Sequence, residues 1–421
     1  MSQAADAPAG YPVDELFDPL APDFLADPFT VLAELPPTAE RPVFFAPSIG
    51  YYIVTRYSDI EQVFRDHGTF SAAVAQAPLA PVVPEAQQAL LGGASTPQPP
   101  SMVSLDEPAH SRLRKPAARA FSMKRVQAMV PTIRATTARL LDAVGDTGQF
   151  DLVAALAFPL PANIVFSLMG VPEQDYGRLK HWCGYRAALS WGRPAPADQV
   201  EIARSIAAYR GYMRDLVDVK LRDPADDLTT DLLAIHREDP GRLTLDEIGS
   251  ILFSLSFAGH ETTTGLIGNA VRRLLEDPAR WAAIVADPGL IPAAVEETLR
   301  FDPSVPVWRR VTTRPAVVGG VELPAGARLF LWLAAAGRDE AAFPAPDAFD
   351  LHRPNSDQHL AFGQGLHYCL GANLGKLEAE IAIGELARRY PRLALAGGQE
   401  LTFHPNISFR GPQSLLVETA S

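Results

Sequence analysis

The segment AFGQGLHYCLG, residues 361–371, contains Cys369, one of only two cysteines in the 421-residue chain. Apolar residues recur at helical spacing after Gly371, which predicts a helix that begins near residues 370–372. Cys369 would then lie at a helix N-terminus, where unpaired backbone N–H groups and the helix dipole favour negative charge. Because this setting lowers the pKa of a thiol, it predicts a thiolate at Cys369.

A thiolate at this position could act as a nucleophile, a redox group or a metal ligand. A zinc site and a redox pair are both disfavoured, because the second cysteine is distant in sequence and CxxC spacing is absent. A nucleophile would need a positioned base, and His367 lies only two residues away on the same loop. A small cysteine that merely packs in the core stays open as the structural alternative.

The phrase FGQGLHYCLG, residues 362–371, resembles the heme-binding signature of the cytochrome P450 family, F-x-x-G-x-[HR]-x-C-x-G, at every fixed position. The resemblance implies that Cys369 is the thiolate ligand of the iron of heme b, and that Phe362 belongs to the heme-binding loop. A thiolate ligand donates electron density to iron and favours cleavage of the O–O bond. The loop glycines would let the backbone pass close to the porphyrin and turn back.

A second segment, residues 243–278, predicts one long helix. Thr244 and Glu247 make a capping box, and Asp277-Pro278 stops the helix after about 32 residues, or about 48 Å. Two glycines and three consecutive threonines near its middle are poor helix formers. They indicate either close packing against neighbouring elements or a distortion beside a ligand, and we favour the distortion.

Within this helix, AGHETT, residues 258–263, resembles the oxygen-activation motif of the same family, [AG]-G-x-[DE]-T-[TS]. By this resemblance Thr262 hydrogen-bonds dioxygen and its water, and Glu261 relays protons from outside, as a carboxylate can. Ala258 is expected to lie beside the heme, and His260 to face away from it.

Cationic residues at the family's positions form a predicted cradle for the two heme propionates, because buried carboxylates need hydrogen-bonded cationic partners. His110 and Arg114 are four residues apart on one predicted helix face, Arg310 lies in VPVWRRV, and His367 lies in the cysteine loop. His359 is a further candidate. Taken singly, each of these residues is more often a surface charge or a satisfied core histidine.

Glu297 and Arg300 lie three residues apart on another predicted helix. An exposed pair at this spacing stabilises a helix by only ~0.2–0.5 kcal/mol. In the family the E-x-x-R pair is a buried network that supports the heme loop, so both residues are assigned a scaffold role.

The residues expected to line the substrate pocket are apolar apart from one threonine. They are Ala258, Thr262, Val305, Pro306, Val307 and Phe409. The segment 74–103, rich in alanine, proline and glutamine, is expected to be irregular and to cover this pocket as a lid. The lining favours a small or medium, largely apolar organic substrate, with ordinary core packing as the alternative for any one residue.

The periodicity along the chain is mostly helical, with short strands, which predicts a mainly α fold with a minor β region. The strands are expected in a hairpin ending at residues 51–56, over 317–323 and over 328–334. Composition marks no boundary, so residues 16–421 are expected to form a single large domain with the cytochrome P450 fold. Residues 1–15 are expected to be a flexible N-terminus.

Composition bounds the partners and the location. Lysine and arginine number 37 against 49 aspartates and glutamates, and this net charge of −12 argues against nucleic acid. A run of about 18 apolar residues is absent, so no transmembrane helix is expected. Sparse cysteine and the lack of a secretory pattern favour the cytoplasm.

Electrons are expected to come from outside the chain, because it contains neither a nucleotide fingerprint nor a four-cysteine cluster. The donor would be a ferredoxin or flavodoxin system, or a reductase domain outside this chain. The basic segment 110–125 would attract an acidic redox partner, with a solvated helix face as the alternative.

These features predict a monooxygenase that uses O2 and electrons from NAD(P)H to hydroxylate or oxidatively dealkylate its substrate. A peroxide-driven peroxygenase is one alternative, although it would not need the pair Glu261 and Thr262. A non-enzymatic heme sensor or carrier is another, which would share Cys369 but would not need an acid–alcohol pair.

Overall fold

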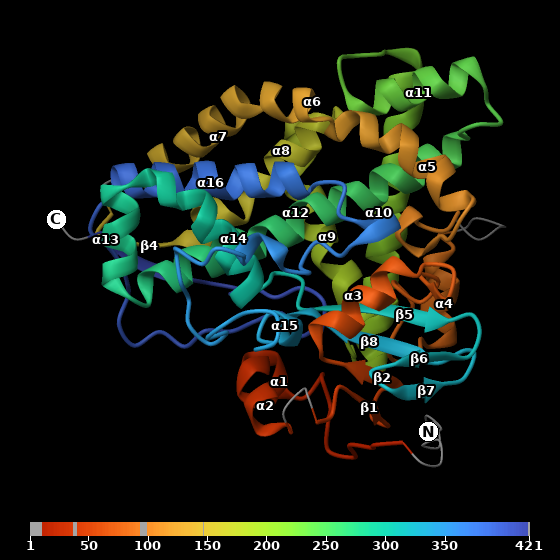
Figure 1. The fold of residues 1–421 in the computed structure, drawn as a ribbon. Helices are drawn as coiled ribbons and strands as arrows, with labels where there is room; N and C mark the ends of the chain where they lie inside the picture. Colours follow the sequence, from red (N-terminus) through yellow and green to blue (C-terminus); the bar gives the residue numbers. More distant parts are fainter. Residues whose placement is uncertain (1–10, 37–39, 93–98, 146, 420–421) are drawn as a thin grey trace.

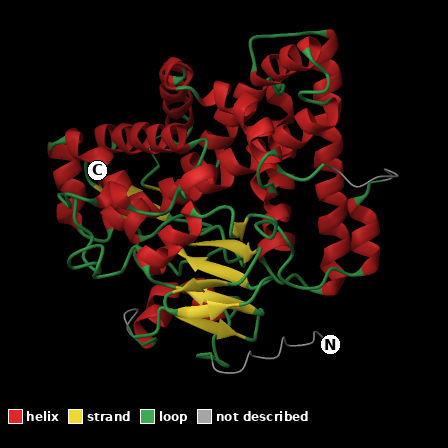
Figure 2. Ribbon diagram, turned by 45° about the vertical axis from the view of Figure 1, so that its right-hand side comes forward, coloured by secondary structure: helices red, strands yellow, loops and turns green. Residues whose placement is uncertain are grey.

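The computed structural model describes residues 11–36, 40–92, 99–145 and 147–419. Helices build most of the molecule, and a twisted sheet lies to one side with the N-terminal segment (Figures 1 and 2). The helices are α1 (Pro22–Ala26), α2 (Pro28–Glu34), α3 (Tyr57–Arg65), α4 (Pro84–Leu90), α5 (Ala109–Ala118), α6 (Met123–Ala128), α7 (Val130–Asp142), α8 (Pro159–Met169), α9 (Tyr176–Trp191), α10 (Pro196–Arg222), α11 (Leu228–Glu238), α12 (Leu245–Leu275), α13 (Pro278–Ala286), α14 (Ile291–Phe301), α15 (Leu333–Ala336) and α16 (Ala372–Arg389).

The strands form three small sheets. They are β1 (Val43–Ala46), β2 (Tyr51–Val54), β3 (Phe70–Ser71), β4 (Gln149–Asp151), β5 (Val307–Thr312), β6 (Ala316–Val318), β7 (Val321–Leu323), β8 (Arg328–Trp332), β9 (Leu393–Leu395) and β10 (Leu416–Thr419). The largest sheet has the order β1-β2-β8-β5-β3, and the others are β4-β10-β9 and β6-β7. The predicted hairpin is confirmed, because β1 and β2 pair antiparallel with Val43 opposite Val54.

The long predicted helix is confirmed as α12, which packs against α8, α10, α14 and α16. Its capping box is present: the Thr244 hydroxyl accepts a hydrogen bond from the Glu247 N–H, and the Glu247 carboxylate accepts one from the Thr244 N–H. The helix ends just before Asp277-Pro278, as the sequence predicts.

The favoured distortion in the middle of α12 is wrong, because the helix is α-helical from Leu245 to Leu275. Its glycines serve close packing instead. A Cβ at Gly259 would lie 2.9 Å from a methyl group of Val165 on α8, and one at Gly265 would lie 2.6 Å from the carbonyl oxygen of Arg410. The alternative that small residues allow neighbouring elements to approach is therefore the correct one.

Two expected strands need correction. Residues 317–323 form the hairpin β6-β7, because Gly319 and Gly320 both have positive φ, +58° and +78°, and turn the chain between them. The strand expected over 328–334 ends at Trp332, where α15 begins. Aliphatic residues continue through this boundary, and their pattern alone does not mark it.

The N-terminus and the lid segment are also more ordered than expected where the structure describes them. Residues 1–10 lie outside the described residues, but Pro12 and Asp14 each share a backbone hydrogen bond with Phe45 of β1, at 2.8 and 2.9 Å. The segment 74–103 contains the helix α4, which packs on α10, while residues 93–98 lie outside the described residues. Pairing with an edge strand and packing on a long helix supply the order that local composition does not indicate.

Candidate functional site

A cavity lies between the middle of α12 and the cysteine loop, and residues from distant parts of the chain line it. Thr262 faces it from α12, and Cys369 faces it from the loop before α16. His110 and Arg114 of α5 and Arg310 of β5 lie at the same cavity. Four separate elements of the sequence therefore meet there.

The backbone of the cysteine loop requires glycine. Gly363 and Gly365 have φ values of +65° and +66°, and a Cβ at Gly365 would lie 2.9 Å from the carbonyl oxygen of Phe64. The N–H of Cys369 donates to the carbonyl of Phe362 at 2.9 Å, which closes the loop. The following helix begins at Ala372, as predicted, so the loop presents Cys369 just before a helix N-terminus.

The pKa of the Cys369 thiol is raised, which corrects the expectation that the helix N-terminus lowers it. Burial raises this pKa, and the N–H groups of Gly371 and Ala372 together with the charge of Arg114 only partly oppose it. A cation in the cavity would reverse the balance, because a coordinating thiol is deprotonated outright. The donor set therefore fits a metal-bound thiolate better than a free one.

Unpaired nitrogen atoms gather at one edge of the cavity. The rings of His110 and His367 lie 4.1 Å apart, and both nitrogens of His110 and Nε2 of His367 are buried without a hydrogen-bond partner. Burial lowers the pKa of His367 to about 3, with Arg310 the next cause, and burial also lowers the pKa of His110. Arg114 adds a guanidinium that donates to the Tyr368 carbonyl. This cluster of donors fits the two carboxylates of heme, because buried donors and cations need anionic acceptors.

His359 does not join this cluster. Its Nε2 lies 3.1 Å from a carboxylate oxygen of Glu296, and its Nδ1 accepts the N–H of Ala361 at 3.1 Å. Lys376 pairs with the same carboxylate at 2.7 Å. His359 is thus occupied in a network beside the loop and is not among the residues that line the cavity, which corrects its candidate role in the cradle. Phe362, by contrast, does line the cavity.

On the opposite wall, Ala258 and Thr262 line the cavity, as expected. The Thr262 hydroxyl donates to the carbonyl of Ala258 at 2.8 Å, so its oxygen keeps its lone pairs for another partner. Burial raises the pKa of the neighbouring Glu261 to about 7. His260 is buried against Phe158, 4.8 Å between ring centres, and faces away from the cavity as expected.

The predicted pocket residues divide into two groups. Val305 and Phe409 line the cavity together with Ala258 and Thr262. Pro306 and Val307 do not line the cavity. Val307 is fully buried in the core, because it lies on the face of β5 opposite to Trp308 and Arg310, which do line the cavity. The expectation for these two positions is therefore corrected.

Sequence reasoning found Phe409 but missed the other three rings of an aromatic wall in the cavity. Trp191 stacks on Phe257 at 5.8 Å and meets Phe409 edge-on at 4.9 Å, and Trp308 lies 6.3 Å from Trp191. All four rings line the cavity. They come from four separate segments without a shared motif, so only the tertiary structure brings them together.

Glu297 and Arg300 form a fully buried ion pair, with nitrogen–oxygen distances of 2.7 and 2.8 Å. Arg353 joins the same carboxylate at 3.1 Å, and Arg300 also donates to the carbonyl of Gly337 at 2.6 Å. The pair ties α14 to the loops that follow β8, in keeping with a scaffold position.

The basic segment 110–125 presents fewer unpaired charges than its composition indicates. Arg112 is paired with Glu247, and Arg125 with Asp231. Arg114 faces the cavity. Within the described part of the chain the segment's remaining cations, Lys115, Arg119 and Lys124, have no carboxylate partner within salt-bridge distance.

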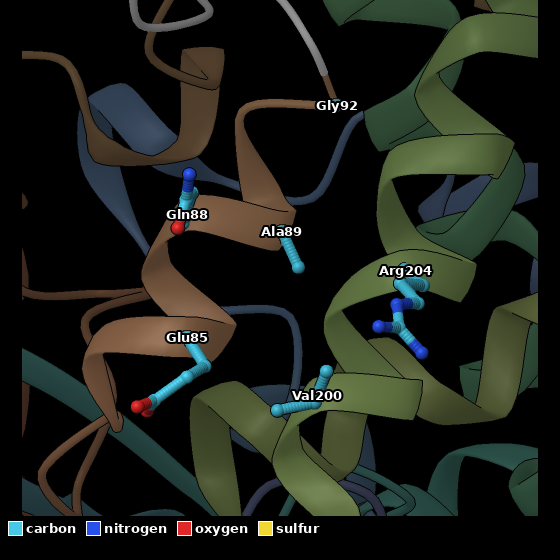
Figure 3. A pocket seen from close by; sticks show the side chains of 6 residues that line it. All are labelled: Glu85, Gln88, Ala89, Gly92, Val200 and Arg204. Carbon is cyan, nitrogen blue, oxygen red and sulfur yellow. The ribbon is translucent and has the colours of Figure 1, made fainter.

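A second, open pocket lies on the surface between α4 and α10 (Figure 3). Its lining residues are Glu85, Gln88, Ala89, Gly92, Val200 and Arg204. It shares none of its lining with the cavity at Cys369. Beside it, the buried Gln199 accepts the N–H of Val83 at 2.9 Å and so fixes the start of α4 on α10.

Comparison with known proteins shows the family to which this chain belongs. Erythromycin C-12 hydroxylase of Saccharopolyspora erythraea is 36% identical over 382 residues, which cover 90% of this chain and 92% of that protein. The family model described as Cytochrome P450 matches residues 288–413. The chain belongs to the cytochrome P450 family.

Solved structures of cytochromes P450 have the same fold. The heme domain of CYP116B5 from Acinetobacter radioresistens superposes with a TM-score of 0.91 at 35% identity, covering 96% of this chain and 97% of that one. An intact type IV self-sufficient cytochrome P450 monooxygenase gives 0.93 at 35% identity, over 99% of this chain and 55% of the other. The predicted fold class is confirmed.

This cytochrome P450 is a heme-thiolate monooxygenase, as its resemblance implied. Its cofactor is heme, and its reaction uses O2, an organic substrate and a redox partner. Of the helices that the structure describes, not one has the length and apolar character needed to cross a membrane.

Proposed function

We propose that Cys369 is the iron ligand, that His110, Arg114, Arg310 and His367 hold the heme propionates, and that the aromatic wall above Thr262 receives the substrate. The observation that carries this assignment is a single cavity with a thiol on one wall, a hydroxyl on the other and unpaired donors at its edge. When bound, heme supplies the redox chemistry that activates dioxygen and oxidises the substrate.

The chain's own residues supply binding and protons. Glu261, with a pKa of about 7, can take up and release a proton near neutral pH. The Thr262 hydroxyl donates its hydrogen to the Ala258 carbonyl, so its Oγ1 would accept a hydrogen bond from a proton-bearing group in the cavity. Glu261 itself does not line the cavity, so a proton that it releases would enter the cavity at Thr262, the next residue of α12, and such a pair favours a monooxygenase over a peroxygenase.

The substrate is a neutral, largely apolar molecule that this protein hydroxylates or dealkylates. Support comes from the aromatic wall of Trp191, Phe257, Trp308 and Phe409, which excludes water, while the two arginines that line the cavity, Arg114 and Arg310, lie with His110 instead. A charged group would lose its hydration there without a counter-charge.

The electron donor is a separate ferredoxin- or flavodoxin-type protein, with a reductase domain on another part of the polypeptide as the second possibility. The self-sufficient relative, of which this chain covers 55%, supports that second source. Exposed Tyr368 on the cysteine loop and the cations Lys115 and Lys124 mark the face that such a donor would approach. Two free cysteines fit the reducing cytoplasm, where we place the protein.

The first experiment is a carbon monoxide difference spectrum of the reduced, purified protein. A strongly red-shifted Soret band is expected, because a thiolate ligand donates electron density to iron. Cys369→His should lose this band, while Cys183→Ala, at the other buried free cysteine, should keep it. Heme that lacks the shift in the unmodified protein would assign the iron to another ligand and favour a heme sensor.

A further inference from the structure

A buried arginine fixes the loop that precedes the lid helix α4. Arg309 of β5 is fully buried and donates to the carbonyls of Ala77 at 2.7 Å, Ala75 at 2.9 Å and Ser190 at 3.3 Å. Its remaining contact is the Tyr51 hydroxyl at 3.4 Å. The two terminal nitrogens of this buried guanidinium hold the carbonyls firmly, because its Nε has no partner and releasing a carbonyl would leave still more of the group unpaired.

The same loop is fixed a second time, from the wall of the cavity. The indole N–H of Trp191 donates to the carbonyl of Ala75 at 3.0 Å. The Ala75 carbonyl, before Gln76, thus accepts from both Trp191 and Arg309, and the Ala77 carbonyl, after it, accepts from Arg309. Gln76 has little freedom to leave its place beside the aromatic wall.

The Gln76 side chain lines the cavity, and its amide makes no hydrogen bond with another residue in the described ranges. Two other polar groups of the cavity are already engaged: Ser254 pairs with Ser101 at 2.8 Å, and Thr262 donates to Ala258. Gln76 thus offers the cavity an amide whose donor and acceptor are both unused. An amide can bind a carbonyl, a hydroxyl or an ether oxygen.

An apolar ligand that covered Gln76 would strip water from its amide without replacing the hydrogen bonds, which is unfavourable. A ligand with one oxygen at the right place would replace them. The rings of Trp191 and Phe409 next to it suit a flat apolar body.

We infer that Gln76 selects neutral substrates that combine a flat apolar ring system with one carbonyl or hydroxyl oxygen, and that Arg309 is the positioning residue for Gln76. The inference rests on the proposed use of this cavity as the substrate pocket, and it specifies the substrate class.

The test compares two ligands of one shape, 1-tetralone and tetralin, which differ by a single carbonyl. Their affinities for the holoenzyme are measured from the low- to high-spin Soret shift and by calorimetry. The quantity of interest is the Kd of tetralin divided by the Kd of 1-tetralone. Gln76→Leu should weaken 1-tetralone binding by roughly fivefold, the effect of one net hydrogen bond, and leave tetralin binding unchanged or tighter.

Gln88→Leu is the matched control, because Gln88 is exposed on α4 and lies at the surface pocket, outside the cavity (Figure 3). It should leave the ratio unchanged. Arg309→Lys keeps the positive charge but has fewer hydrogen-bond donors, and it should lower this Kd ratio as Gln76→Leu does. If Arg309 were merely structural, the variant would weaken the binding of both ligands equally and leave the ratio unchanged.

A ratio that Gln76→Leu does not change, or binding of neither ligand, would overturn the inference. The carbon monoxide spectrum of each preparation separates this result from failure of the proposed function. A red-shifted band with an unchanged ratio contradicts only the role of Gln76, whereas loss of the band in the unmodified protein contradicts the role of Cys369.

Discussion

Thr262 and Thr264 make the same local contact but face different surroundings. Each hydroxyl donates to the carbonyl four residues earlier, at 2.8 and 3.1 Å. Thr262 lines the cavity, while Thr264 is buried and does not. The difference separates a chemical role from a structural one, since replacing either residue removes the same kind of hydrogen bond from α12.

Thr262→Ala should reduce product formed per NAD(P)H by roughly tenfold and increase hydrogen peroxide release, because a missing acceptor misplaces the protons, and acid–base groups contribute at least this much. Turnover with substrate, a redox partner and a peroxide assay measures both quantities. Thr264→Ala should leave the coupling near that of the unmodified protein. Equal loss in both variants would instead indicate damage to the helix.

Glu261 should make the stability of the folded protein depend on pH, in addition to its proposed role in proton transfer. Its folded pKa of about 7 lies above the ordinary value of 4.5, so between these pH values the folded protein holds a proton that the unfolded chain has released. Stability from this group is therefore present below pH 4.5 and is lost as the pH rises to about 7. The loss is on the order of 3 kcal/mol at most.

Glu261→Gln should remove this dependence, because glutamine does not titrate. Urea unfolding at pH 5 and pH 8 gives the comparison, and the variant should lose less stability between the two than the unmodified protein does. If both proteins change equally, Glu261 has an ordinary pKa, and its assignment as a proton carrier loses its support.

At the scale of elements, α12 is held by close contacts that the sequence motif does not reveal. Gly265→Ala should cost about 1–3 kcal/mol, because the added Cβ would lie 2.6 Å from the backbone oxygen of Arg410, which cannot rotate away. Chemical denaturation checks this value. Gly249→Ala, in the same helix, would meet only the flexible side chain of Arg214 at 3.4 Å and should be neutral or stabilising by up to about 1 kcal/mol. Similar losses in both would show that helix propensity, rather than packing, governs the two positions.

What could be predicted from the sequence differs between kinds of element. The ends of α12 were predictable, because the capping box at Thr244 and the proline at residue 278 act locally. The reason for its glycines was not predictable, because the residues that pack on them are distant in sequence. Val165 lies 94 residues before Gly259, and Arg410 lies 145 residues after Gly265. The hairpin β6-β7, by contrast, is a feature that the sequence does signal locally, because Gly319-Gly320 lies between two apolar stretches and both glycines have positive φ.

The candidate site divides in the same way. Cys369, Glu261 and Thr262 were found because short motifs hold them, and the cradle residues were found by their positions in the family. Gln76 and the aromatic residues Trp191, Phe257 and Trp308 were not found, because they lie outside these motifs and their arrangement depends on contacts such as the one between Trp191 and Ala75. His359 had the right residue type, but the carboxylate of Glu296 next to it was not foreseeable from its spacing.

At the scale of the whole molecule, one buried carboxylate joins three distant segments. Asp302, which follows α14, pairs with Arg272 and Arg273 of α12 and with Arg410 near the C-terminus. Although burial raises its pKa, the three guanidinium groups outweigh burial and hold the pKa well below its usual range. Asp302 therefore stays charged and balances the arginines that surround it.

Asp302→Asn should lower the free energy of unfolding by about 3–5 kcal/mol, because it leaves buried arginines without their counter-charge. Urea unfolding of the holoenzyme measures the loss, and the carbon monoxide spectrum shows whether the fraction that folds still binds heme. Asp347→Asn is the control: Asp347 also pairs with an arginine, Arg338, but its side chain is 85% exposed, so the cost should be less than about 1 kcal/mol. A loss of that small size at Asp302 would mean that the arginines find other partners, and that the three segments are joined by apolar packing instead of by this carboxylate.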